Sequence, residues 1–200
     1  MLIGLEKEMF VKNAEGKVIL VPKDIPKDDC GYLAEARGLP FNNIAEAVYS
    51  LKASEHKIIH AATTAKLHID DSPILKVSKD VRLEARRLYS KGIIAYRNLY
   101  NYKDHKHSSN ECPAGVHISF TNPVNALADG KVIRTVNALF DFVSIFKALD
   151  SAFKSEIKAA KRNPGFYEIK SDNRIEYRSL PSNVNLSKVI NVVNEALKGL

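Results

Sequence analysis

The fold is decided by the stretch Gly4-Leu5-Glu6-Lys7-Glu8-Met9-Phe10, near the start of the chain. Successive side chains of a β-strand point to opposite faces, so the two glutamates share one face while Leu5 and Met9 share the other. Lys7 interrupts the apolar face, and we expect it to mark a strand near the edge of its sheet. The stretch therefore predicts a strand with one ionisable face and one largely apolar face.

The same design recurs in three further stretches, which are Leu33-Ala34-Glu35-Ala36-Arg37, Gly115-Val116-His117-Ile118-Ser119 and Arg174-Ile175-Glu176-Tyr177-Arg178. Any one of them could be an ordinary strand with a solvated outer face, because half-exposed antiparallel sheets are patterned in this way. A solvated face would also carry Lys, Thr and Gln, whereas these strands carry mainly Glu, His and Arg. Taken together, the four strands favour a single sheet face that gathers ionisable side chains.

Such a face suits a particular chemistry. Carboxylates that are close together repel one another unless cations lie among them. Magnesium takes hard oxygen ligands and keeps coordination positions for water and phosphate oxygens, and an imidazole can join the ligand set. Arginine matches phosphate or carboxylate with two parallel N–H groups. The pattern therefore predicts a site for a divalent cation and a phosphate-bearing ligand.

The remaining elements set the fold class. Helices are expected at four places, which are Asn42 or Asn43 to about Leu67, Lys79 to Lys91, Val136 to about Arg162, and Leu186 to Lys198. Lys17 to Val21 is expected to return beside the first strand, and Phe166 to Lys170 to precede the last one. Strands and helices are interspersed without regular βαβ alternation, which predicts an α+β fold with a largely antiparallel sheet covered by helices on one face.

Composition and charge bear on the number of domains, the partners and the location of the protein. Two hundred residues, 45% of them hydrophobic, predict a single domain over residues 1–200. The net charge of +7 comes with scattered lysines, so we expect a solvated basic surface and no specific nucleic-acid partner. Without a signal peptide or an apolar run of about 18 residues, we expect no membrane partner and a cytoplasmic location, the host cytoplasm if the protein is phage-encoded.

Two cysteines and a histidine-rich segment need separate interpretation. Cys30 and Cys112 lack zinc-cluster or CxxC spacing, which predicts thiols, although pairing between them is left open. His105 and His107 lie with Cys112 in or beside a polar segment rich in Lys, Ser and Asn. We expect that segment to be an exposed loop or lid rather than a metal cluster.

Three motifs resemble a known group of enzymes. They are the opening stretch from Gly4 to Phe10, the stretch Pro113-Ala114-Gly115-Val116-His117-Ile118-Ser119-Phe120, and Gly165-Phe166-Tyr167 followed by Arg174-Ile175-Glu176-Tyr177-Arg178-Ser179. Their order and type resemble the carboxylate–amine ligases related to glutamate–cysteine ligase and glutamine synthetase, in particular the compact phage-type COOH–NH2 ligases (amidoligases). The motifs span residues 4 to 181, almost the whole chain.

The resemblance implies a curved antiparallel sheet around a site for ATP, Mg²⁺ and an acid substrate. Its implied metal ligands are Glu6, Glu8, Glu35, His117 and Glu176, with Asp28 or Asp29 as a further acidic candidate. Its implied cofactor-binding residues are Arg162, Lys170 and Arg178, and its implied catalytic residues are Arg178, Arg37 and Glu35. The implied reaction is ATP-dependent amide formation through an acyl phosphate, between carboxylate- and amine-bearing substrates that are small molecules or peptides.

Three positions depart from the family pattern. Arg174 stands where a glycine usually precedes the late Ile-Glu pair, Glu168 stands where an arginine is common, and Ser119 replaces a second histidine. These changes bear on the ATP and amine contacts more than on the metal ligands. The alternative function is therefore a non-catalytic descendant of the fold, a phage or mobile-element protein that binds a partner or nucleotide.

Overall fold

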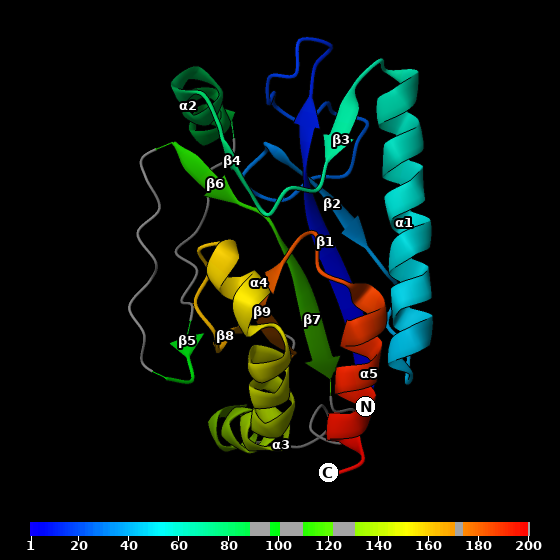
Figure 1. Cartoon of the computed structure of the whole chain (residues 1–200), viewed down its shortest axis with the longest axis vertical. Coiled ribbons are helices and arrows are strands. Elements are labelled where there is room, and N and C mark those ends of the chain that lie inside the picture. Colours follow the sequence, from blue (N-terminus) through cyan, green and yellow to red (C-terminus); the bar gives the residue numbers. More distant parts are fainter. Residues whose placement is uncertain (89–96, 101–109, 122–130, 171–173, 200) are drawn as a thin grey trace.

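The computed structural model describes residues 1–88, 97–100, 110–121, 131–170 and 174–199, with the backbone alone for 131–141 (Figure 1). Its strands are β1 (Leu2–Lys12), β2 (Leu33–Arg37), β3 (His68–Asp70), β4 (Ile74–Lys76), β5 (Arg97–Asn98), β6 (Glu111–Pro113), β7 (Gly115–Thr121), β8 (Phe166–Ile169) and β9 (Ile175–Pro181). Its helices are α1 (Ile44–Thr64), α2 (Lys79–Leu88), α3 (Lys131–Ala152), α4 (Lys154–Ala159) and α5 (Leu186–Leu197).

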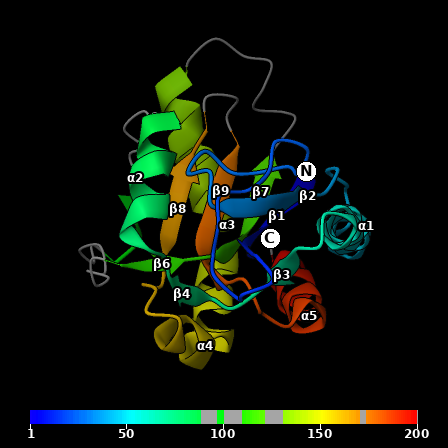
Figure 2. The same ribbon diagram turned by 90° about the horizontal axis from the view of Figure 1, so that it is seen from above.

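One large sheet organises the molecule. Its strands follow the order β2-β1-β7-β9-β8-β5, and β3 pairs with the end of β1 beyond β7. All strand pairings within the described residues are antiparallel, including that of the separate β4-β6 pair. The strands change direction markedly from β2 to β8 when the sheet is seen from above (Figure 2), as expected of a twisted sheet. The predicted α+β class and largely antiparallel sheet are confirmed.

The apolar face of the sheet is the main core. Leu5, Ile118 and Tyr177, from three adjacent strands, are almost fully buried there. Helices α1, α3, α4 and α5 cover this face and contribute to the same hydrophobic cluster. Figure 2 shows α4 and α5 together on one side of the strands, and α2 away from them.

A second, smaller cluster covers one end of the opposite face. Phe10 and Leu33, which share that face with the glutamates of β1 and β2, are buried there with Val77 and Cys112. Val81 of α2 packs against this cluster. Both cysteines are free thiols, as predicted, and Cys30 lies partly buried at the edge of the cluster. The polar face is therefore closed at one end by apolar side chains.

Local signals account for most element boundaries. The Asn43 side chain caps α1 by accepting a hydrogen bond from the backbone N–H of Ala45 at 2.7 Å. The helix ends at Thr64, three residues earlier than the predicted Leu67. Just beyond this end, Lys66 has a left-handed backbone conformation with φ of 58°. Asn185 caps α5 in the same way, through the backbone N–H of Lys188.

Several sequence expectations need correction. Lys17 to Val21 does not form a strand, since only Val18 makes an isolated bridge to Lys12. The long helix expected from Val136 begins at Lys131 and is divided at Phe153, whose buried ring packs in the core between α3 and α4. The predicted end of the second helix at Lys91, and the residues His105 and His107, lie outside the described residues.

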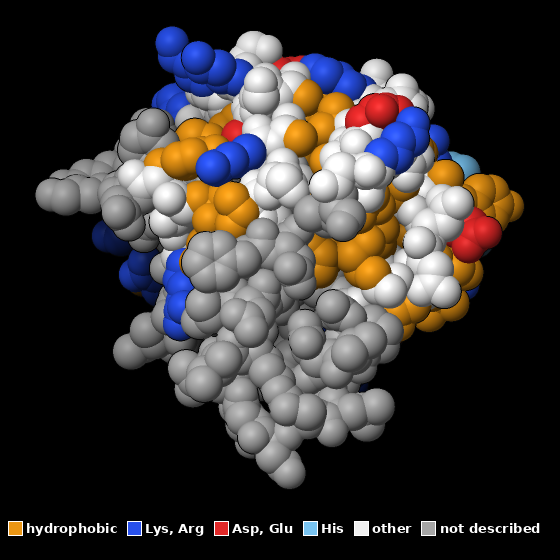
Figure 3. Space-filling view, turned by 90° about the horizontal axis from the view of Figure 1, so that it is seen from below, with side chains coloured by type: hydrophobic (Ala, Val, Ile, Leu, Met, Phe, Trp, Pro, Cys, Tyr) orange, Lys and Arg blue, Asp and Glu red, His pale blue; other side chains and the backbone are white. Residues whose placement is uncertain are grey.

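On the face seen from below, the basic side chains are dispersed, as the scattered lysines of the sequence predict. There, Lys and Arg side chains are scattered around apolar ones rather than gathered into one patch (Figure 3). Within the described residues, no helix has the length and apolar content needed to cross a membrane.

Candidate metal and anion site

The ionisable side chains of four adjacent strands meet on the polar face of the large sheet. Strand register pairs Glu6 with Arg37 of β2 on one side and with His117 of β7 on the other. Glu8 lies opposite Glu35, and Ser119 lies opposite Glu176. The face predicted from alternation in the sequence is therefore present as a continuous surface.

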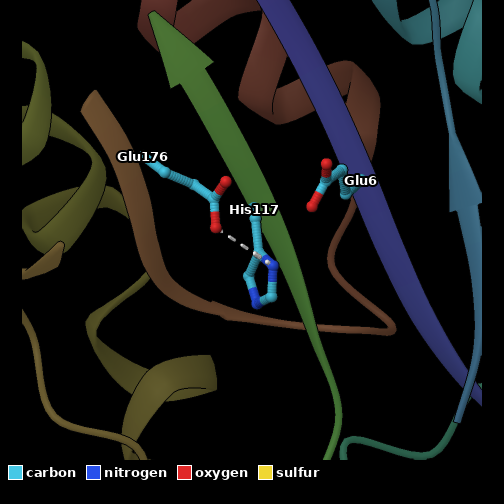
Figure 4. A group of neighbouring side chains, drawn as sticks. All are labelled: Glu6, His117 and Glu176. Carbon is cyan, nitrogen blue, oxygen red and sulfur yellow. Dashed lines mark ion pairs between the residues drawn. The ribbon is translucent and has the colours of Figure 1, made fainter. Parts of the chain in front are cut away.

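Three of these side chains converge most closely. Glu6, His117 and Glu176 come from β1, β7 and β9, and each offers a ligand atom within 4.8 Å of the other two (Figure 4). His117 Nδ1 lies 3.6 Å from a Glu176 carboxylate oxygen, and the two side chains are 1% and 0% exposed. A merely solvated face would leave such groups in water, so their burial rules out that simpler interpretation for His117 and Glu176, while Glu6 is partly exposed.

Glu8 and Glu35 lie beside the trio on the same face. Glu8 accepts a hydrogen bond from the backbone N–H of Gly115 at 2.9 Å, and its carboxylate lies 3.7 Å from His117 Nε2. Burial raises the pKa of Glu8 against the opposing effect of nearby arginines. Burial and the neighbouring carboxylate of Glu6 raise the pKa of Glu35 to about 8, although Arg37 acts in the opposite direction. Carboxylates crowded in this way would gain from a cation.

Arg178 and Lys170 bring positive charge to the opposite side of the trio. The Arg178 guanidinium contacts the Glu176 carboxylate and lies 3.2 Å from Glu168 and 3.9 Å from Glu8. Lys170 Nζ lies 2.8 Å from Glu168 and 3.5 Å from Glu176. Both cations therefore lie between carboxylates rather than in open solvent.

A bulge in β9 lies at Arg178, beside this site. Val116 pairs with Leu180 and Ile118 pairs with Tyr177, so β9 has one additional residue opposite His117. Bulges of this kind redirect side chains and occur often beside active sites. Here Arg178 lies with the polar cluster, while Tyr177 and Leu180 on either side of the bulge are fully buried in the core.

Arg162, which follows α4, reaches the same surface. Its guanidinium donates a hydrogen bond to the backbone carbonyl of Arg178 at 2.5 Å and lies against Gly115. Arg37 lies at the other side of the site, where it contacts Glu35 at 2.5 Å and Glu6 at 3.6 Å. Its side chain is 59% exposed, so Arg37 is the most accessible cation of this group.

Other residues differ from the sequence expectations. Lys7 does not mark an edge, because β1 lies between β2 and β7, and its Nζ lies on the core side at 2.6 Å from Glu55 of α1. Asp28 is buried in a turn, where it accepts hydrogen bonds from Cys30 and Gly31, while Asp29 is exposed. Asp28 is near enough to contribute to the raised pKa of Glu8, but it is not among the three closest ligand atoms.

Glu168 is the site residue that sequence reasoning did not select. The sequence marks it only as a departure from the family pattern, because its strand is short and its polar alternation is limited to two residues. In the structure it lies opposite Glu176 in the β8–β9 pairing and contacts both Lys170 and Arg178. Only the pairing of β8 with β9 shows that Glu168 belongs to the site.

The donor set fits a hard divalent cation. Carboxylate oxygens dominate it, with one buried imidazole, and the ligand atoms of the trio are close enough to share one ion. Cysteine thiols lie elsewhere, in or beside the second cluster, so the soft ligands favoured by zinc or copper are absent from this described cluster. Within the trio, the residues present are therefore suited to Mg²⁺.

Comparison with known proteins bears on the fold. No protein-family profile and no curated protein matches the sequence. Among solved structures, the chain is similar to a bifunctional glutathione synthetase from Pasteurella multocida, with a TM-score of 0.54 and 11% sequence identity. The fold resembles part of a synthetase. The match covers 98% of this chain and 37% of the solved chain, so the similarity concerns little more than a third of the larger protein.

Proposed function

We propose that the chain is an ATP-dependent carboxylate–amine ligase that forms an amide bond on a Mg-ATP site. The observation that carries the proposal is the convergence of Glu6, His117 and Glu176 from three adjacent strands, with ligand atoms within 4.8 Å of one another and with His117 and Glu176 buried. Basic side chains on the same face supply the complementary charge for phosphate.

Two further points support this function over other metal-dependent reactions. The motifs around Glu6, His117 and Glu176 resemble those of the glutamate–cysteine ligase and glutamine synthetase superfamily. We therefore propose that the sheet is a version of the catalytic core of that superfamily. The structural neighbour is, by its name, a synthetase of glutathione, a peptide whose amide bonds join carboxylates to amines. The proposal treats residues 1–200 as one catalytic domain working in the cytoplasm.

The residues take distinct parts in the proposal. Glu6, Glu8, Glu35, His117 and Glu176 would hold magnesium, which supplies charge neutralisation for phosphoryl transfer when bound. Arg178, Arg162 and Lys170 would orient the phosphates. Arg37, which is exposed at the open side of the site, would hold the substrate carboxylate with its planar fork, and Glu35 would fix that arginine.

The proposed reaction has two steps. A carboxylate oxygen of the acid attacks the γ-phosphorus of ATP, and the bond to the bridging oxygen breaks to release ADP. The amine nitrogen then attacks the acyl carbon, loses a proton and displaces inorganic phosphate. Arg178 would offset charge in both steps, and the rigid sheet would keep the reactants oriented.

The decisive test is release of ADP when panels of acids and amines are presented with Mg-ATP. We expect ADP release that requires Mg²⁺, an acid and an amine, and that is abolished in Glu6→Ala. Glu46→Ala, at an exposed position in the first turn of α1, is the matched control and should retain activity. If calorimetry shows no binding of ATP with magnesium, the proposal is wrong. Metal-dependent ATP binding without turnover on any pair would instead support the non-catalytic alternative.

A further inference from the structure

The two cysteines of the chain meet in the second hydrophobic cluster, although they are far apart in the sequence. Cys112, in β6, is 4% exposed within that cluster, and Cys30 packs against it from the turn that precedes β2. The hydroxyl group of Tyr32 forms hydrogen bonds with both thiols. Each sulfur atom is therefore a direct neighbour of the same oxygen atom.

A tight turn fixes the position of the Cys30 sulfur. Asp28 Oδ1 accepts hydrogen bonds from the Cys30 thiol at 2.8 Å, from the Cys30 backbone N–H at 3.1 Å and from the Gly31 backbone N–H at 3.2 Å. Gly31 has φ of 77°, a conformation that glycine adopts at little cost. The turn thus holds a partly exposed thiol beside the Tyr32 hydroxyl.

We propose that Cys30 and Cys112 form a reversible intramolecular disulfide, and that small disulfides are the reagents that oxidise the pair. Tyr32 is only partly buried, so a rotation of its side chain can remove the hydroxyl from beside the two sulfurs. The bond also needs α-carbons within about 7 Å of each other. The turn is the segment that adjusts to this distance, because Cys112 is buried in the middle of a paired strand.

The oxidation proceeds in two balanced exchanges. The sulfur of Cys30, the more accessible thiol, attacks one sulfur of the small disulfide, and the other half leaves with the proton of Cys30. The sulfur of Cys112 then attacks Cys30 Sγ in the mixed disulfide, and the second half leaves with the proton of Cys112. Two protein thiols are oxidised to one disulfide, and one reagent molecule is reduced to two thiols. Cys112 does not react first, because it is buried and burial raises the pKa of its thiol.

The bond joins two segments that border the polar face of the large sheet. The turn carries Asp28, which lies near enough to Glu8 to add to the effect of burial on the pKa of that carboxyl. Strand β6 is followed after one residue by Gly115, whose backbone N–H donates to Glu8. The disulfide therefore cross-links the closed end of this face. It also closes a long loop of the chain, which restricts the unfolded state.

Oxidation can be followed without any ligand of the polar face. Reduced protein is treated with bis(2-hydroxyethyl) disulfide, and the remaining thiols are alkylated with iodoacetamide before mass spectrometry. We expect most of the protein to lose two hydrogen atoms and to take up no alkyl group, at a rate that does not depend on protein concentration. Dithiothreitol should restore both thiols. The oxidised protein should melt roughly 5–10 °C above the reduced protein.

Single substitutions test the order of the two exchanges. Cys112→Ser should stop at the mixed disulfide on Cys30. Cys30→Ser should react at least about tenfold more slowly than Cys112→Ser, because its remaining thiol is buried. The inference is independent of the proposed function, since Glu6→Ala should form the same disulfide as the wild type.

Three results would overturn the inference. One is a folded wild type that accumulates only mixed disulfides, and another is one that forms only disulfides between chains. The third is a disulfide between Cys30 and Cys112 that forms in urea and not in the folded protein.

Discussion

The guanidinium of Arg162 lies so close to the α-carbon of Gly115 that a β-carbon at residue 115 would come within 2.8–2.9 Å of it. The backbone N–H of the same glycine donates to Glu8. One residue without a side chain thus allows a buried carboxylate and an arginine to approach the same point of β7. The charge of Arg162 in turn lowers the pKa of Glu8, although burial has the larger, opposite effect.

Gly115→Ala should therefore impair the site more than the fold. The arginine side chain can move aside, so we expect a loss of about 1 kcal/mol or less in the free energy of unfolding. Mg-ATP affinity should fall roughly tenfold, because Arg162 would leave its place beside Glu8. Gly4→Ala is the matched control on the same face, since its β-carbon would meet nothing closer than 3.8 Å. Equal effects of the two substitutions on calorimetric affinity would contradict this prediction.

Removal of one member of the trio should abolish metal binding. In Glu6→Gln the hard anionic oxygen is lost while the side-chain volume is kept, so thermal stabilisation by Mn²⁺ or Mg²⁺ should disappear. The metal-free variant should unfold at the same temperature as the wild type or slightly higher, because a crowded carboxylate is removed. A differential scanning fluorimetry titration measures both quantities. Retention of the metal-induced shift would show that the cation binds elsewhere.

The metal-free protein should lose stability as the pH rises from about 5 to 8. Glu35 has a pKa near 8 in the folded state, against an ordinary value of 4.5, so the folded state holds an additional proton in this window. The free energy of unfolding must then fall with increasing pH, by on the order of 3 kcal/mol for this group. Urea unfolding of Glu35→Gln at pH 5.5 and 8.5 should show a much smaller change. The decrease of stability with pH that remains in this variant should come from Glu8, because burial raises the pKa of that carboxyl as well.

Asp150, which lies on the core side of the sheet, should contribute strongly to the stability of the fold. Its carboxylate accepts hydrogen bonds from the Tyr177 hydroxyl at 2.7 Å, the Gly165 backbone at 2.9 Å and the Tyr100 hydroxyl at 3.0 Å. Asp150→Asn turns one of these oxygens into a donor that faces another donor, so we expect a loss of about 2–4 kcal/mol. Asp24→Asn, at an exposed position, should change stability by less than about 0.5 kcal/mol. Chemical denaturation of both variants provides the comparison.

Alternation in the sequence was sufficient to place the site residues on one face, because the direction of a strand side chain depends only on its own backbone. The pairs Glu6 with Glu8 and Glu176 with Arg178 were predicted in this way and do share the polar face. Caps are equally local, and the predicted cap at Asn42 or Asn43 is confirmed, with Asn43 as the residue that begins α1.

Strand neighbours could not be predicted in the same way, because pairing depends on residues far apart in the chain. Lys7 appeared to mark an edge strand, whereas Glu55 of α1 supplies the partner that allows it to be buried in the middle of the sheet. Strands β3 to β6 have only two or three residues each, too few for a periodic signal. Glu168 was missed for a related reason, since its contacts arise from the pairing of β8 with β9.

The additional residue of β9 gives the strand two segments whose side-chain alternation is out of phase. Ahead of the bulge, odd-numbered residues such as Ile175 and Tyr177 enter the core, and beyond it the even-numbered Leu180 does so. Deleting the additional residue would restore regular pairing and leave Arg178 and Leu180 on their present faces, whereas a deletion elsewhere in the strand would turn the residues between it and the bulge to the other face. Single-residue deletions should thus be tolerated at the bulge better than at the other positions of β9, a difference that a library of such deletions would reveal.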